Sequence, residues 1–254
     1  MYVTVSPRFE PTTRVAYTRT EIAETIDQIE HELAREALRV TGLGRHLEIT
    51  TVGDVPAGTG MGSSSSLTVG LLNALYAYRG DIAGPANLAR IACQIEIDIL
   101  GKPIGRQDEY AAAFGGVNYI RFNPDHTVDV EPVPCRPETM DRLQECIILL
   151  YTGTRRSADG ILKEQSAGTA DRMSVLRQMR DLAGDLRNAV AGEGDLDEFA
   201  RILHEGWELK RSLGLRHRRT ASRRLVSACP QPRRAWRQTP RRRRRRVPAA
   251  AGAA

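Results

Sequence analysis

Residues 52–70 read VGDVPAGTGMGSSSSLTVG, a glycine-rich turn that runs directly into four serines and then into an apolar helical pattern. Gly58, Gly60 and Gly62 let the backbone adopt positive φ and come close to a ligand, which a Cβ would hinder. The serines add hydroxyls and free N–H groups at the start of the expected helix, where about half a positive charge favours an anion. The stretch therefore predicts a phosphate-binding loop around which the chain is organised.

This loop matches neither of the two common nucleotide-binding motifs. A Walker A loop has a lysine after its last glycine, whereas Ser63 follows Gly62. The G-x-G-x-G spacing also differs from the dinucleotide G-x-G-x-x-G, and the acid about 20 positions on, Asp81, lies in a glycine-flanked turn. A Gly/Ser linker is the alternative interpretation, but apolar sequence on both sides of the stretch argues against it.

Hydrophobic periodicity predicts a mixture of strands and helices along the chain. Strands are expected at 1–9, 14–18, 46–52 and 145–151, helices at 28–41, 63–78, 85–100, 155–190 and 195–213, and a strand–turn–strand at 117–133. A β-rich half with packed helices, followed by a strand-and-helix half, indicates an α+β fold in two lobes. The corresponding domains are 1–135, 136–215 and a tail at 216–254.

Glu96 is the first candidate functional residue because of its neighbours on the helix expected at 85–100. The residues three and four positions away are all apolar: Ala92, Cys93, Ile99 and Leu100. The carboxylate is therefore expected to face inward, where it costs several kcal/mol or takes up a proton unless it has a partner. A metal ion or a cationic group removes that cost. Asp98, with polar helical neighbours, is expected to be solvated.

Asp108 is the second candidate, in the polar loop expected after that helix. It lies between Gln107 and Glu109, ahead of a run of small residues that lets the backbone pack closely. A carboxylate held there can orient and deprotonate a substrate hydroxyl, as an aspartate does in kinase phosphoryl transfer. An ordinary solvated acid is the alternative interpretation.

The stretch PAGTGMGSSSS at 56–66 resembles the P-x-x-x-G-L-G-S-S-A/S loop of the GHMP kinases, the superfamily of galactokinase, homoserine kinase, mevalonate kinase and phosphomevalonate kinase. Three further stretches are similar to the bacterial D-glycero-D-manno-heptose 7-phosphate kinases within it: EIDILGKPIGRQDEYAAAFGGVNYIRFNPD, LLYTGTRRSADGILKEQ and LHEGWELKRSL. The resemblance covers most of residues 1–213 and implies the two-lobed α+β GHMP-kinase fold, with the nucleotide between the lobes.

The resemblance also implies a set of site residues. In galactokinase-like members a metal-binding Glu precedes the catalytic Asp by twelve residues, as Glu96 precedes Asp108. Carried over, Ser64 and Glu96 would ligate Mg²⁺ and Asp108 would act as the base. The residues expected to bind ATP are Pro56, Gly58, Gly60, Gly62, Ser63, Ser64 and Ser65.

The reaction implied by the resemblance is ATP-dependent phosphorylation of the anomeric hydroxyl of D-glycero-D-manno-heptose 7-phosphate to the 1,7-bisphosphate. Fucokinase-like sugar 1-kinases share the loop and are the alternative. Arg155 and Arg156 are candidates for the 7-phosphate, and Arg106 for phosphate or transition-state charge, with surface arginines as the alternative for all three.

The C-terminal tail differs sharply from the rest of the chain. All 31 acidic residues lie at or before Glu208, whereas 14 of the 37 Lys and Arg lie in 216–254, so residues 1–215 carry a net charge of −8, from 23 basic and 31 acidic residues. Clustered arginines with Trp236 would suit a nucleic-acid arm. The favoured hypothesis is instead an out-of-frame terminus after about residue 213, disordered and with no nucleic-acid partner.

Bulk properties favour a reduced, cytoplasmic compartment, and the resemblance implies an enzyme whose small-molecule partners are ATP and a sugar phosphate. The 254 residues are 41% apolar without a run long enough to span a bilayer, and the four cysteines lack metal-ligand spacing. In GHMP kinases a sugar-binding S-x-A-G-G-G-T-D segment precedes the position that corresponds to Met1 of this chain, and a second glycine-rich motif lies near the C-terminus. We therefore expect a kinase incomplete at both ends, whose activity depends on those segments; the oligomeric state is open.

Overall fold

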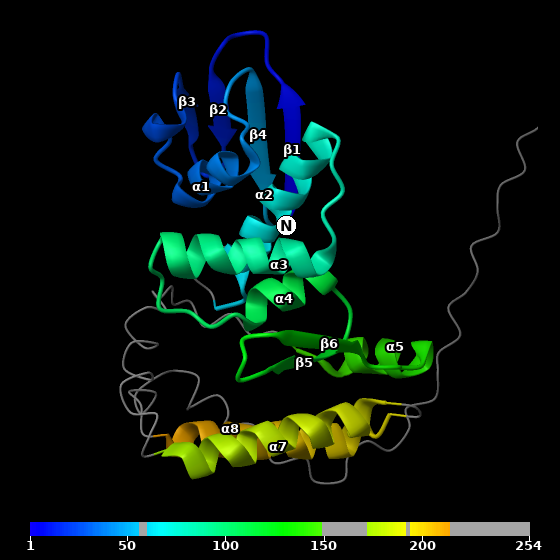
Figure 1. Cartoon of the computed structure of the whole chain (residues 1–254). Helices are drawn as coiled ribbons and strands as arrows, with labels where there is room; N and C mark the ends of the chain where they lie inside the picture. Colours follow the sequence, from blue (N-terminus) through cyan, green and yellow to red (C-terminus); the bar gives the residue numbers. More distant parts are fainter. Residues whose placement is uncertain (56–59, 149–171, 192–193, 214–254) are drawn as a thin grey trace, which may run out of the picture. The chain divides into compact units, whose positions relative to one another are not determined.

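The computed structural model describes residues 1–55, 60–148, 172–191 and 194–213 (Figure 1). The chain divides after His217, so the described residues all belong to the first of two units. The Arg-rich tail lies outside them, and the predicted domain boundary after residue 135 stays a prediction. None of the helices in the described ranges is long and apolar enough to cross a membrane.

The first sheet has four strands in the order β1-β4-β2-β3. They are β1 (Tyr2–Pro7), β2 (Thr13–Ala16), β3 (Thr20–Ala23) and β4 (Leu47–Val52). Strand β4 pairs antiparallel with β1 and parallel with β2. The crossover that the parallel pair needs consists of β3 and helix α1 (Glu32–Thr41), which lie between β2 and β4 in the chain. Strand β3 was not predicted from the sequence; the strands expected at 1–9, 14–18 and 46–52 correspond to β1, β2 and β4.

Helices α1, α2 (Ser63–Arg79) and α3 (Pro85–Cys93) share one hydrophobic core with this sheet. Side chains alternate along β4, so that Leu47 and Ile49 are buried with Val15 of β2 in one core. From α2, Leu71, Leu72 and Leu75 enter this core and are completely buried. Helix α2 is therefore the central helix of the described fold, and its first turn follows directly on the glycine-rich loop after β4.

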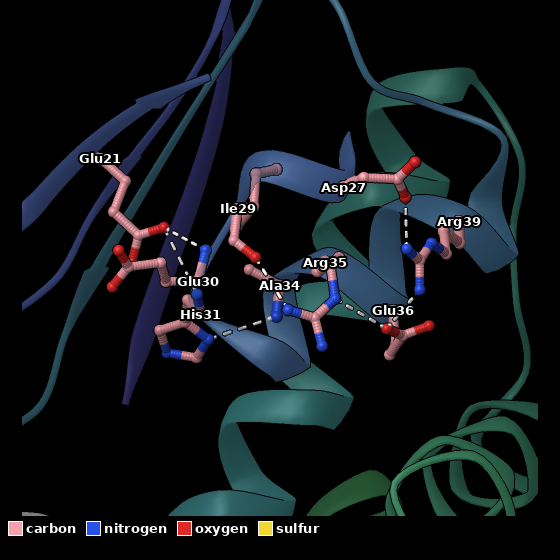
Figure 2. Close-up of polar contacts among 9 residues, drawn as sticks. All are labelled: Glu21, Asp27, Ile29, Glu30, His31, Ala34, Arg35, Glu36 and Arg39. Carbon is pink, nitrogen blue, oxygen red and sulfur yellow. Dashed lines mark hydrogen bonds and ion pairs between the residues drawn. The ribbon is translucent and has the colours of Figure 1, made fainter. Parts of the chain in front are cut away.

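The start of α1 is held by hydrogen bonds from the chain just before it (Figure 2). The Glu21 carboxylate accepts the backbone N–H groups of Glu30, at 2.7 Å, and of His31, at 3.3 Å. Nδ1 of His31 accepts the N–H of Ala34 at 3.3 Å and so acts as the N-cap of α1. Burial lowers the pKa of His31, which favours the neutral ring that this acceptor role needs.

Beyond α3 the same helical segment changes its winding. Residues Gln94–Ile99 form a π-helical turn, in which the Leu100 N–H donates to the Ile95 carbonyl five residues earlier. The helix predicted at 85–100 is thus present, but with a π-helical second half. Such turns are common at functional sites, and Glu96 lies within this one.

Helix α4 (Gln107–Phe114) occupies a stretch that the sequence had indicated as a polar loop and a run of small residues. Its three alanines favour a helix, and Asp108 and Glu109 in its first turn complement the helix dipole. Asp108 therefore lies on a helix and not in a loop. Tyr110 of α4 packs against the hairpin of β5 (Asn118–Phe122) and β6 (Val128–Pro132), whose strands were predicted.

The remaining described elements are helices α5 (Pro137–Cys146), α7 (Met173–Val190) and α8 (Leu196–Ser212). The strand predicted at 145–151 is wrong at its start, because Glu145 and Cys146 are the last residues of α5. The periodicity of a short apolar run cannot tell a strand from the end of a helix. Helix α8 confirms the one expected at 195–213, and α7 forms the second part of the one expected at 155–190. Residues 155–171 fall outside the described ranges.

Candidate functional site

The N-terminus of α2 is open at the point where the loop enters it. Gly62 is the N-cap residue with φ of +64°, and no side chain in the described part of the chain caps the helix. Gly60 also has positive φ, +76°. Both values confirm that the loop uses the backbone conformations that glycine favours. Pro56 and Gly58, also predicted to bind the anion, lie outside the described residues.

Glu96 lies directly behind this helix end. Its side chain is 0% exposed, which confirms the inward orientation predicted from its apolar helical neighbours, while Asp98 is exposed as expected. The Ser64 hydroxyl donates a hydrogen bond to Oε2 of Glu96, and the Thr68 hydroxyl is 2.8 Å from Oε1. Ser64 and Thr68 are one turn apart on α2, so one face of that helix supplies a hydroxyl to each carboxylate oxygen.

The Asp108 carboxylate lies at the other side of the loop end. A methyl group added at Gly62 would be 3.3 Å from Cγ and from Oδ2 of Asp108. The side chain of Asp108 is otherwise exposed, on the first turn of α4. The structure thus brings Asp108 close to Gly62, the N-cap residue of α2, 46 residues earlier in the chain.

Glu109 is a further acidic residue at this place, and sequence reasoning missed it. It is 0% exposed, and neither carboxyl oxygen has a hydrogen-bond partner within the described ranges. Burial, and secondarily the charge of Glu96, raise the pKa of Glu109 to about 7. The neighbour test used for Glu96 gives only half of its signal here, because Ala112 and Ala113 follow three and four residues later but Arg106 and Gly105 precede at the same spacings.

Arg106, the N-cap residue of α4, points away from the start of α2 and toward the β5–β6 hairpin. Its guanidinium lies over the ring of Phe122, 5.3 Å from the centroid, and donates to the His126 carbonyl at 3.3 Å. Arg106 therefore contacts the β5–β6 hairpin in this structure. The other two arginines predicted from the sequence, Arg155 and Arg156, lie outside the described residues.

The donor set at the helix end consists of oxygen atoms. The first turn of α2 offers the hydroxyls of Ser63, Ser64 and Ser65, and the acids offer the carboxylates of Glu96 and Asp108. Hard cations such as Mg²⁺ prefer such ligands and are usually held by one or two protein oxygens together with phosphate oxygens. Within the described ranges, no group of three or more His, Cys, Asp or Glu residues is arranged to hold a metal alone.

Residues 27–116, which include all of these described side chains, match the family model of the GHMP kinases N terminal domain. D-glycero-alpha-D-manno-heptose 7-phosphate kinase of Campylobacter jejuni is 31% identical over 163 residues, which are 63% of this chain and 48% of the relative. L-fucokinase/L-fucose-1-P guanylyltransferase of Bacteroides fragilis is 27% identical over 197 residues, 75% of this chain and 20% of the relative. These matches thus span half or less of the curated relatives.

A solved structure gives a longer match. The crystal structure of a D-glycero-D-manno-heptose 1-phosphate kinase from Bacteroides thetaiotaomicron superposes with a TM-score of 0.68 at 30% sequence identity. The match covers 83% of this chain and 67% of that one. The family model, the curated relatives and the solved structure therefore all point to the GHMP kinases.

Proposed function

Because this chain belongs to the GHMP kinase family, we propose that it transfers the γ-phosphoryl group of ATP to the anomeric hydroxyl of D-glycero-D-manno-heptose 7-phosphate, giving the 1,7-bisphosphate. The observation that carries the proposal is the position of Asp108 against Gly62, at the open end of the helix whose Ser64 binds Glu96. A phosphate site, an oxygen pair for a cation and a base are thereby adjacent. The proposed compartment is the cytoplasm, where ATP is available.

The loop and the first turn of α2 are proposed to bind the ATP phosphates. Gly60 and Gly62 have the positive φ that lets the backbone approach them, and Pro56 and Gly58 are assigned to the same loop. The N–H groups and hydroxyls of Ser63, Ser64 and Ser65 would donate to phosphate oxygens at the positive end of the helix dipole. Binding there requires no lysine, which agrees with the absence of a Walker A motif from the stretch.

Ser64 and Glu96 would hold Mg²⁺. One hydroxyl and one buried carboxylate, already in contact, fit a cation that takes its other ligands from water and phosphate. When bound, Mg²⁺ supplies neutralisation of the charge that develops on the phosphate oxygens during transfer. Glu96 would thereby gain the cationic partner that its complete burial calls for.

Asp108 would act as the general base. Its exposed carboxylate, placed beside the end of the phosphate loop, would orient the anomeric hydroxyl of the sugar and accept its proton as the oxygen attacks the γ-phosphorus. Arg155 and Arg156 are proposed for the 7-phosphate. Arg106 stays a weaker candidate, since reaching a substrate would mean leaving the Phe122 ring.

A fucokinase-like sugar 1-kinase is the second candidate function, which the match to the Bacteroides fragilis relative over 75% of this chain supports. The test is ADP release by the purified full chain with ATP and Mg²⁺, comparing heptose 7-phosphate with L-fucose and D-galactose. Turnover at least about tenfold faster with heptose 7-phosphate is expected, a difference of about 1.4 kcal/mol. Faster turnover of L-fucose would favour the alternative, and no binding of Mg·ATP would contradict both.

Replacing Gly62 by Ala should lower kcat by about tenfold, because the new methyl group would crowd the Asp108 carboxylate and shift it from its position beside the loop. Gly80→Ala is the matched control, since Gly80 also has positive φ, +87°, but open space around its Cβ position. Both variants should lose about 1 to 2 kcal/mol of unfolding free energy from backbone strain. Equal kcat values in the two variants would contradict the proposed position of Asp108.

A further inference from the structure

Thr68 differs from an ordinary buried threonine in what its hydroxyl contacts. The side chain is 0% exposed on the second turn of α2. Its Oγ1 is 3.1 Å from the Ser64 carbonyl oxygen, the usual acceptor for a helical threonine, and 2.8 Å from Oε1 of Glu96. A hydroxyl has a single proton to donate, and a hydrogen bond to a carboxylate is stronger than one to a neutral carbonyl.

Thr41 shows what a buried threonine does without such a carboxylate. It is 1% exposed on α1, and its hydroxyl is satisfied within its own helix by the carbonyls of Ala37, at 2.8 Å, and Leu38, at 3.2 Å. The same kind of acceptor is within reach of Thr68. The contact with Glu96 is therefore not needed merely to satisfy the Thr68 hydroxyl.

The contact matters for the orientation of the Glu96 carboxylate. The terminal torsion of a glutamate is broad, so the carboxylate turns easily unless its oxygens are held. Thr68 occupies Oε1, which leaves Oε2 on the side of Ser64. We propose that Thr68 is a positioning residue that orients Glu96 so that Oε2 and the Ser64 hydroxyl are presented together to the divalent cation.

This role rests on the proposed function, and it is tested through metal binding and not through turnover. The probe is Mn²⁺ with a non-hydrolysable ATP analogue, followed by electron paramagnetic resonance on the full chain. Thr68→Val keeps the shape and removes the hydroxyl, whereas Thr68→Ser keeps the hydroxyl. Thr41→Val makes the same chemical change at a buried threonine away from Glu96.

Thr68→Val is expected to weaken Mn²⁺ binding by at least about tenfold, the usual loss when a group that hydrogen-bonds a metal ligand is removed. The Mn²⁺ affinities of Thr68→Ser and Thr41→Val should be close to that of the unmodified chain. Circular dichroism checks that the variants are folded; if Thr68→Val is not, normal Mn²⁺ affinity in Thr68→Ser supports the role and impaired affinity overturns it. Equal Mn²⁺ affinity in the unmodified chain and Thr68→Val overturns the role of Thr68 alone. No Mn²⁺ binding by the unmodified chain overturns the proposed function as well.

Discussion

Replacing Asp108 by Asn is expected to lower kcat by about a thousandfold, within the range of general-base effects, because the amide keeps the shape of the carboxylate but accepts no proton at neutral pH. Binding of Mg·ATP should change by no more than about threefold, or about 0.7 kcal/mol, since Asp108 lies beside the phosphate loop and is not one of the proposed metal ligands. Steady-state ADP release gives kcat, and calorimetry with a non-hydrolysable ATP analogue gives the dissociation constant.

Asp98→Asn is the matched control for this experiment. Asp98 is an exposed acid on the π-helical turn, and the same loss of charge there should leave both quantities unchanged. An undiminished kcat in Asp108→Asn would remove the base role. A parallel loss of nucleotide binding and of kcat would indicate instead that Asp108 shapes the loop.

Replacing Glu109 by Gln is expected to raise the free energy of unfolding at pH 8 by about 2 to 3 kcal/mol. The pKa of Glu109 is raised from 4.5 to about 7 in the folded chain, so the unfolded chain ionises first as the pH rises. Between pH 4.5 and about 7 this group therefore lowers stability progressively, and above pH 7 the loss is complete. A glutamine of the same shape has no charge to bury and no such pH dependence.

Urea unfolding at pH 4.5 and at pH 8 measures the effect: the two chains should be nearly equal at the lower pH and differ at the higher one. Glu145→Gln, at an exposed position of α5, is the control and should change little at either pH. A stability difference between Glu109→Gln and the unmodified chain that does not depend on pH would contradict the raised pKa of Glu109.

The parts of the site that depend on local sequence could be predicted from it. The conformations of Gly60 and Gly62, the start of α2 and the inward orientation of Glu96 all follow from spacing within one helix or one turn, and all are confirmed. The resemblance to GHMP kinases is confirmed as well. The roles assigned to individual residues stay predictions.

The features that the sequence did not predict are helix α4, the position of Asp108 beside Gly62 and the burial of Glu109. Helix α4 is eight residues long and follows a stretch rich in glycine and proline, so its pattern was too short to outweigh the loop signal. The closeness of Asp108 to Gly62 depends on how α4 packs near the start of α2, and no periodicity in the sequence connects these two elements. Glu109 was overlooked because the helix that contains it was not predicted. Only on a helix do Ala112 and Ala113 lie on the same face as Glu109.

If the proposed phosphate site is correct, a nucleotide bound at the uncapped start of α2 would also stabilise the fold. Helices α1 and α8 begin with side-chain caps, His31 and Asp195, whereas the first turn of α2, like those of α3, α4, α5 and α7, has no side-chain cap among the described residues. A bound phosphate would complete this turn. Since a ligand that binds only the folded state adds RT ln(1 + [L]/Kd) to stability, the cell's ATP level would then help to determine how much of this chain is folded.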